Sequence, residues 1–333
     1  MLSTKENFYE TLKPDGHPDR LVNGFEFMKL IVPDPALRFT HVKIPQGAKG
    51  IDGWGVTWSF ADGESAPAPY HTPDTLAIKD ILHWRDELKI PDLADANLDW
   101  SEAKEKVNSV DRDAHLVSAF FVSGVFERLH MLMGFEDALV NMMLESETTK
   151  ELCDAICEQR LTHARLLVEN LRPDIVLSHD DWGTKTNLFM KPDIWRTLIK
   201  PQYRKIYDYF RSEGVIVMHH ADSFMEPIVD DMVELGIDIW QGVLPQNDIV
   251  RLQKELRGRM ILMGGIDAAV VDTSFATETV IREETRRACE TYGPGGHFIP
   301  CLTYGEPGVD IYPHVEEYIR DEIRKYNETC VKP

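Results

Sequence analysis

Several features that would mark particular classes of protein are missing from this chain of 333 residues. A membrane-spanning helix needs about 20 apolar residues in a row. The longest mostly apolar stretch here, around 116–126, is much shorter and is interrupted by Ser118, Ser123 and Gly124. The N-terminus also lacks the basic-then-apolar pattern of a secretory signal. We therefore expect no membrane association or export, and predict a cytoplasmic location.

Basic charge and cysteine are scarce as well. The 36 Lys and Arg residues face 56 Asp and Glu residues, which gives a net charge of −20 without any basic run. Such a chain is a poor binder of nucleic acid and of anionic membranes. Its five cysteines include no CxxC pair, so a disulfide framework is not expected. Cys153 and Cys157, four apart in a helical pattern, are predicted to be packing residues.

No GxGxxG or GxxxxGK[ST] motif occurs, which argues against an open, doubly wound nucleotide-binding sheet. From about Asp113 onward, short apolar runs instead alternate with amphipathic stretches of helical period. This alternation predicts parallel β/α units with right-handed crossovers. The predicted strands are 115–122, 174–178, 214–218, 237–242, 260–263 and 297–300, and the predicted helices are 136–144, 149–170, 192–212, 227–235, 248–256, 277–292 and 311–325.

The first 110 residues have a different character. They are rich in turns and proline, with a predicted hairpin around 54–61. The chain length allows two domains of about 150 residues or one α/β barrel of about 250 residues with additions. We predict a single (β/α)8 TIM-type barrel domain over 1–333. In it, residues 1–110 supply early strands and a cap over the barrel mouth.

Polar side chains follow the predicted strands at the points where each strand ends, which is where barrel enzymes place their active sites. His220, Asp222 and Cys301 carry the three kinds of group that Zn²⁺ accepts. The His-x-Asp spacing puts both side chains on one side of an extended chain. His219 should point the other way, as a structural histidine. A buried cysteine is also often only a small apolar side chain.

Other groups fall at the same level of the predicted barrel. Asp180 and Asp181 form either an acid/base pair or a loop-capping pair. Aromatic and polar residues near the mouth are expected to line a site for a flat organic substrate, although core packing predicts the same aromatic residues. The candidate substrate-binding residues are Phe121, Phe126, Trp182, Gln241 and Asp267.

Four long segments, 121–139, 180–210, 218–243 and 263–268 (MGGIDA), resemble the uroporphyrinogen decarboxylase superfamily, and most closely its corrinoid-dependent methyltransferases. The segment 6–28 and the WGVTW motif at 54–58 are similar to methyltransferase components of anaerobic O-demethylase systems. The resemblance covers nearly the whole chain and implies a β/α barrel.

The resemblance implies transfer of a methyl group from an O-methyl compound, expected to be an aromatic methyl ether, to a Co(I) corrinoid carried by a partner corrinoid protein. It is also compatible with a homodimer. The leaving oxygen would need a zinc ion as Lewis acid or a proton from Asp181, His219 or Tyr304.

Zinc-binding members of the superfamily use His-x-Cys and a distant Cys, which correspond here to His220, Asp222 and Cys301. Asp222 in place of a cysteine makes the ligand set harder. This change favours an oxygen-bearing substrate, or a site with weakened or absent metal.

Three alternatives remain open at this point. The chain could catalyse the second half-reaction, from a methylcorrinoid to a thiol or to tetrahydrofolate. It could be a decarboxylase of the superfamily, although the segment 21–30 lacks the arginines that hold porphyrinogen carboxylates. It could also be a non-catalytic barrel that serves as a binding subunit.

Overall fold

The computed structural model describes residues 1–64, 66–304 and 310–330. Its central feature is a parallel sheet of seven strands, in the order β1-β5-β6-β7-β8-β9-β10. The strands are β1 (Met28–Ile31), β5 (Leu116–Phe121), β6 (Ile175–His179), β7 (Ile216–His220), β8 (Ile239–Val243), β9 (Ile261–Ile266) and β10 (Phe298–Leu302). The sheet curls as in a TIM-type β/α barrel, which confirms the predicted fold class.

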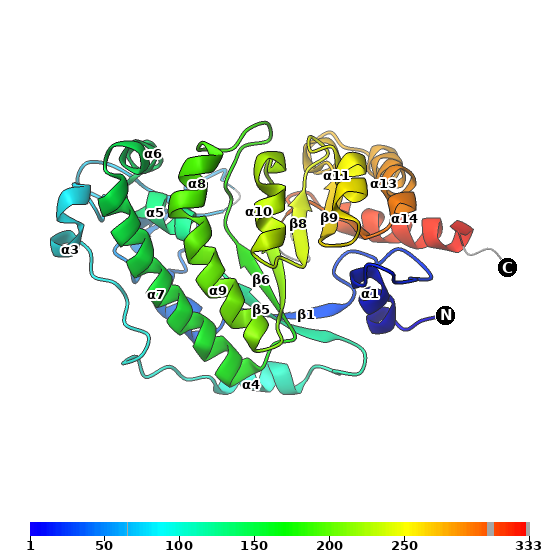
Figure 1. Cartoon of the computed structure of the whole chain (residues 1–333), viewed down its shortest axis with the longest axis horizontal. Coiled ribbons are helices and arrows are strands. Elements are labelled where there is room, and N and C mark those ends of the chain that lie inside the picture. The colour runs from blue at the N-terminus through cyan, green and yellow to red at the C-terminus, as the bar shows by residue number, and fades with distance from the viewer. Residues whose placement is uncertain (65, 305–309, 331–333) are drawn as a thin grey trace.

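Helices follow the strands and cover the outside of the sheet. Figure 1 shows α7, α8 and α9 along one side of the sheet and α11, α13 and α14 at the other. The helices are α1 (Thr4–Leu12), α2 (Pro35–Thr40), α3 (Trp84–Glu87), α4 (Ser101–Asn108), α5 (Val125–Met133), α6 (Phe135–Leu144), α7 (Ser146–Leu171), α8 (Pro192–Leu198), α9 (Lys200–Ser212), α10 (Val229–Glu234), α11 (Ile249–Leu256), α12 (Ala268–Val271), α13 (Glu278–Tyr292) and α14 (Val315–Cys330). Three short 3-10 turns are η1 (Ile81–His83), η2 (Glu226–Ile228) and η3 (Gly293–Gly295). No helix in the described part of the chain has both the length and the apolar character needed to cross a membrane.

The strands carry apolar side chains on both faces, since one face packs inside the barrel and the other packs against the outer helices. Alternate residues point to opposite sides of a strand. One set of these residues packs inside the barrel and includes Ile175, Leu177, Met218, Ile239 and Ile299. The other set, which includes Val117, Val176 and Val217, packs beneath the outer helices. Nearly continuous apolar runs are the expected pattern for strands that are buried on both sides.

Helix α1 closes the barrel at the amino ends of the strands. Ser3 and Glu6 form a capping box at its start. Phe8 of α1 joins the interior cluster and stacks on Phe27, with ring centroids 3.9 Å apart. His297, directly before β10, approaches the Thr11 carbonyl with Nδ1 at 3.1 Å. The opposite, carboxyl end of the strands is therefore the end available for a site.

The N-terminal segment differs in part from the expectation. Within 1–64 and 66–110 it supplies one strand of the main sheet, so the described sheet has seven strands rather than eight, with β1 and β10 at its edges. The remaining strands, β2 (Lys49–Ile51), β3 (Thr57–Ser59) and β4 (Ala68–Pro69), form a separate antiparallel sheet that contains the predicted hairpin. Proline and turn residues keep these strands short.

The helix predicted over 192–212 is two helices, α8 and α9. Pro201 causes the break because proline has no backbone N–H to donate into a continuing helix. Helix α5 begins at Val125, only four residues after the end of β5, and Gly124 is its N-cap. The apolar run 115–122 was predicted as a strand, but the helix that follows it was not predicted.

Candidate functional site

Two neighbouring strands deliver a histidine each to the carboxyl end of the barrel. His179 is the last residue of β6 and His220 the last residue of β7, and the two are partners in the parallel register. Both continue the inward-facing series of their strands, after Leu177 and Met218. Their rings stack with centroids 4.4 Å apart. The stacking follows directly from the register of the two strands.

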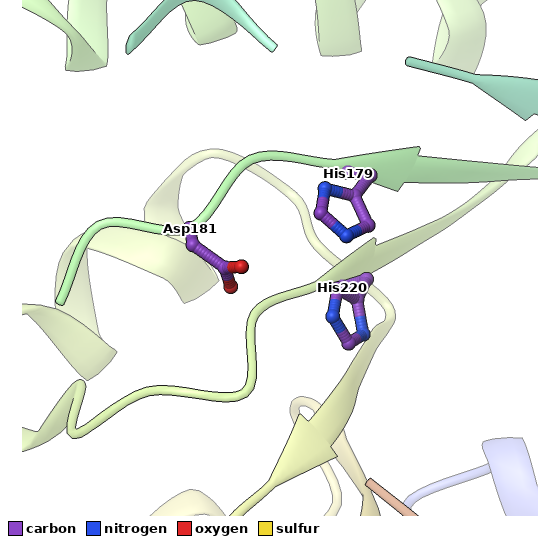
Figure 2. A group of neighbouring side chains, drawn as sticks. All are labelled: His179, Asp181 and His220. Atoms are coloured by element: carbon purple, nitrogen blue, oxygen red, sulfur yellow. The ribbon is translucent and has the colours of Figure 1, made fainter. Parts of the chain in front are cut away.

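Asp181 completes this group. It lies two residues after His179, in the loop that leaves β6, and Figure 2 shows its carboxylate pointing toward the two imidazole rings. One ligand atom from each of His179, Asp181 and His220 lies within 4.8 Å of the others. We call these three residues the His-Asp cluster. His220 is buried, whereas His179 and Asp181 are half-buried and open to the mouth.

Glu127 of α5 holds His179 in place. The His179 Nδ1 lies 2.8 Å from a Glu127 carboxylate oxygen, and the other oxygen accepts the Gly124 backbone N–H at 3.2 Å. Burial by itself would lower the pKa of His179, but the Glu127 carboxylate outweighs burial and raises it to about 10. Burial would likewise raise the pKa of Glu127, but the charge on His179 lowers it to about 2. The two groups therefore form an ion pair in the absence of other ligands.

Gln241 of β8 holds His220. The Gln241 Oε1 lies 2.5 Å from His220 Nδ1. Its amide nitrogen donates to the Tyr304 carbonyl at 2.9 Å and approaches the Cys301 sulfur at 3.8 Å. A bulge at the end of β8 makes this contact possible, because Gly242 there has φ +90° and a Cβ would come within 3.0 Å of the His220 ring. Burial lowers the pKa of His220 well below its ordinary value.

One further carboxyl group, that of Asp222, lies beside the cluster. The Asp222 backbone N–H donates to Asp181 at 3.1 Å. Burial raises the pKa of Asp181 to about 8 and that of Asp222 to about 6. Charge repulsion between carboxylates adds to the effect at Asp181. This end of the barrel therefore carries an excess of acidic groups over cations.

Asp180 has a structural role. Its carboxylate accepts the N–H groups of Phe126 and Glu127, the Trp182 indole N–H and the Tyr203 hydroxyl, at 2.7–3.0 Å. Four donors saturate the carboxylate and anchor the start of α5. The two residues therefore do not act as a pair. Asp180 caps a helix, whereas Asp181 faces the mouth.

The other predicted catalytic and metal-binding residues lie at different places relative to the His-Asp cluster. His219 points outward, stacked on Trp182 with its Nδ1 2.7 Å from the Tyr207 hydroxyl, and burial lowers its pKa to about 3. Cys301 faces inward but is separated from His220 by Gln241. Tyr304 is half-buried at the rim, and its pKa is raised first by burial and then by Asp272.

The predicted aromatic lining is not in the mouth. Phe121 is an outward-facing residue of β5 that packs edge-on against Phe210. Phe126 packs on Phe189, and Trp182 on Trp195. All three belong to the core between the sheet and the outer helices. Asp267 caps α12 by accepting the Ala269 N–H, and Gln241 alone of the predicted substrate-binding residues touches the cluster.

His179 and Glu127 were not among the site residues predicted from the sequence. Strand alternation carried a usable signal for His179, because it lies two residues after the inward-facing Leu177. No comparable signal existed for Glu127, since its role depends on how α5 docks over the end of β6.

The three residues of the His-Asp cluster could hold a metal ion that polarises an oxygen atom of a substrate. Two imidazole nitrogens and a carboxylate are accepted ligands of Zn²⁺ and of other divalent transition metals. The residues present therefore fit a metal, in a set that shares only His220 with the predicted one.

The fold and the site define a β/α-barrel protein with a titratable cluster at the carboxyl ends of its strands. A match to a known family narrows this class further. Residues 55–317 match the family Uroporphyrinogen decarboxylase (URO-D), and the chain belongs to this family. The family resemblance seen in the sequence is confirmed.

Among solved structures, a methyltransferase from Methanosarcina mazei is similar over 98% of this chain and 99% of that one, with a TM-score of 0.65 and 14% sequence identity. A sugar phosphate isomerase/epimerase from Parabacteroides distasonis covers 69% of this chain and 89% of its own, with a TM-score of 0.29 and 12% identity. None of the curated proteins matches the chain.

Proposed function

We propose that the chain transfers a methyl group from an O-methyl compound to the Co(I) corrinoid of a separate corrinoid protein. The observation that carries this proposal is the His-Asp cluster at the open end of a URO-D-family barrel. Similarity to the M. mazei methyltransferase along the whole chain supports it. So does the sequence resemblance to O-demethylase methyltransferases.

The chemistry of the reaction places its difficulty at the oxygen. Co(I) supplies the electron pair that forms the new bond to the methyl carbon, and the C–O bond breaks with its electrons going to oxygen. The leaving group is then an alkoxide or a phenolate, which must be charge-neutralised or protonated. Activation of the attacking atom is unnecessary, so catalysis by this chain acts on the leaving oxygen.

The His-Asp cluster is the part of the chain that acts on this oxygen. His179, His220 and Asp181 converge from two strand ends on one point of the mouth. A divalent metal held by these three residues would polarise the ether oxygen as a Lewis acid. Glu127 and Gln241 fix the orientations of the two rings, so the cluster is held in place before the substrate arrives.

The preference for an aromatic ether rests on leaving-group chemistry rather than on an aromatic lining. The three aromatic residues expected to hold a ring are packed in the outer core. A phenolate is a much better leaving group than an alkoxide, so an aryl methyl ether makes the smallest demand on the cluster.

The test mixes the enzyme, a Co(I) corrinoid and a methoxyphenol without oxygen, and follows loss of the Co(I) absorption band and release of the phenol. Replacement of His220 or Asp181 by Ala should slow methyl transfer by about 10²-fold or more. His83→Ala is the matched control, since His83 is exposed and far along the chain from the cluster.

Two results would contradict the proposal. One is that no O-methyl compound methylates Co(I). The other is efficient demethylation of methylcobalamin by a thiol or by tetrahydrofolate under the same conditions, which would assign the second half-reaction to the chain.

A further inference from the structure

We infer that this chain builds a divalent transition-metal centre from His179, Asp181 and His220, between β6 and β7, and not from the His220, Asp222 and Cys301 set that its sequence suggests. The inference deepens the proposed function by naming the metal ligands and the residues that orient them.

The hydrogen bonds of Gln241 determine the protonation of His220. The Tyr304 carbonyl can only accept, so the Gln241 atom that faces it at 2.9 Å must be the amide nitrogen. The Gln241 atom facing His220 is then the carbonyl oxygen, which also can only accept. His220 must therefore donate from Nδ1, and its Nε2 carries a free lone pair, which is the form that binds a metal.

His179 has the same arrangement with a stronger acceptor. The Glu127 carboxylate receives the Gly124 N–H on one oxygen and faces His179 Nδ1 with the other. A metal that binds His179 would therefore replace the proton on Nε2, the ring nitrogen that Glu127 does not hold. Metal-binding histidines almost always donate their second ring N–H to a carboxylate or a carbonyl oxygen, and both histidines here meet that condition.

The neighbouring charges also fit a cation. Glu127, Asp181 and Asp222 crowd this end of the barrel, and Lys185 is the cation other than His179 that acts on them. A bound metal would replace the positive charge that His179 loses with its proton. Two imidazoles and one carboxylate suit Zn²⁺, Fe²⁺ or Co²⁺ better than Mg²⁺ or Ca²⁺, which prefer oxygen ligands alone. Three protein ligands leave positions open for a substrate oxygen.

Cys301 is kept out of this set by the amide of Gln241. Its sulfur approaches the Gln241 nitrogen at 3.8 Å, and Gln241 lies between it and His220. The thiol therefore packs against the amide inside the barrel.

The test measures metal binding to the full-length chain without a methyl donor or corrinoid, so its failure is distinguishable from failure of the proposed methyl transfer. Purified protein is stripped of metal and titrated with Zn²⁺ and with Co²⁺. Bound metal is then counted by elemental analysis, and the visible spectrum of the Co²⁺ form is recorded.

We expect one metal per wild-type chain and no thiolate-to-cobalt charge-transfer band. His179→Ala, Asp181→Asn and His220→Ala should each lose the metal or weaken its binding by at least 10²-fold. Cys301→Ser should bind like the wild type. Glu127→Gln and Gln241→Leu, which alter only the orienting partners, should weaken binding by about 10–100-fold. Circular dichroism and thermal unfolding check that each variant is folded.

Three outcomes would overturn the inference. The first is that the folded wild-type chain binds no metal at micromolar Zn²⁺. The second is that Cys301→Ser loses the metal and the wild type shows a thiolate band. The third is that folded His179→Ala and Asp181→Asn bind the metal as well as the wild type does.

Discussion

At the scale of single residues, adjacent positions in this chain have opposite roles. Asp180 is buried with four donors at the start of α5, whereas Asp181 faces the mouth. His219 packs beneath the outer helices, whereas His220 faces the barrel interior. In each pair the residue type is the same. The side of the backbone to which the side chain points decides whether the group supports the fold or the site.

His41 shows how such placement makes stability depend on pH. It follows α2, with its Nε2 3.3 Å from Ser123 Oγ and 3.4 Å from an Arg128 nitrogen. Burial, followed by the charges of Arg128 and Arg160, lowers its pKa to about 3, whereas an unfolded histidine has a pKa of about 6.5. Between these values the unfolded chain binds more protons, so the free energy of unfolding falls as the pH drops below about 6.5.

We predict that protonation linked to His41 lowers the free energy of unfolding of the wild type by about 1–2 kcal/mol between pH 7 and pH 5. His41→Gln should remove this part of the loss. Urea unfolding at the two pH values measures it. His17→Gln, at an exposed position, is the control and should keep the wild-type dependence. An unchanged pH dependence in His41→Gln would show that His41 is not the group responsible.

At the scale of elements, the small N-terminal sheet is tied to the barrel by one buried ion pair. Asp52 lies in the turn between β2 and β3, and Arg128 lies on α5. Their charged groups are 2.9 Å apart and at most 1% exposed. Asp52 also accepts the Trp58 indole N–H and the backbone N–H groups of Trp54 and Val56. One carboxylate thus orders the hairpin and fastens it near the end of β5.

Asp52→Asn should destabilise the protein by about 3–5 kcal/mol, because it leaves the buried Arg128 guanidinium without a compensating charge. Urea unfolding measures the loss, and limited proteolysis should show earlier cleavage within 43–75. Glu151→Gln, which breaks the exposed pair with Arg85, should cost less than about 1 kcal/mol. Equal effects of the two substitutions would mean that the buried pair does not anchor the sheet.

At the scale of the whole molecule, family membership leaves the reaction open, because one fold supports several chemistries. The segment 21–30, which leads into β1, contains Lys29 and no arginine. Arg20, just before it, is paired with Glu26 at 3.3 Å. The segment therefore offers no free guanidinium for the several carboxylates of a porphyrinogen.

We predict that the chain does not decarboxylate uroporphyrinogen, since paired guanidinium–carboxylate contacts are what such a substrate requires. Product analysis beside an authentic uroporphyrinogen decarboxylase measures this. Turnover at a comparable rate would place the chain among the decarboxylases and remove the basis of the methyl-transfer proposal.

The sequence by itself determined the parallel β/α architecture, because hydrophobic periodicity is a local property that strands and helices express directly. All six strands predicted after residue 113 are present, with ends shifted by up to three residues. The position of His220 at a strand end was equally readable. The N-terminal segment was less predictable, because its short strands depend on contacts such as Asp52 with Arg128.

Only the tertiary structure decided which polar residues meet. The cluster of His179 with His220 follows from the register of β6 against β7, and the place of Glu127 follows from the docking of α5. Cys301 and His220 are 81 positions apart in sequence numbering, and the amide that separates them comes from a third strand. Which strand ends become neighbours, how α5 docks and where the bulge at Gly242 falls depend on packing between distant segments, because these contacts join residues far apart in the chain.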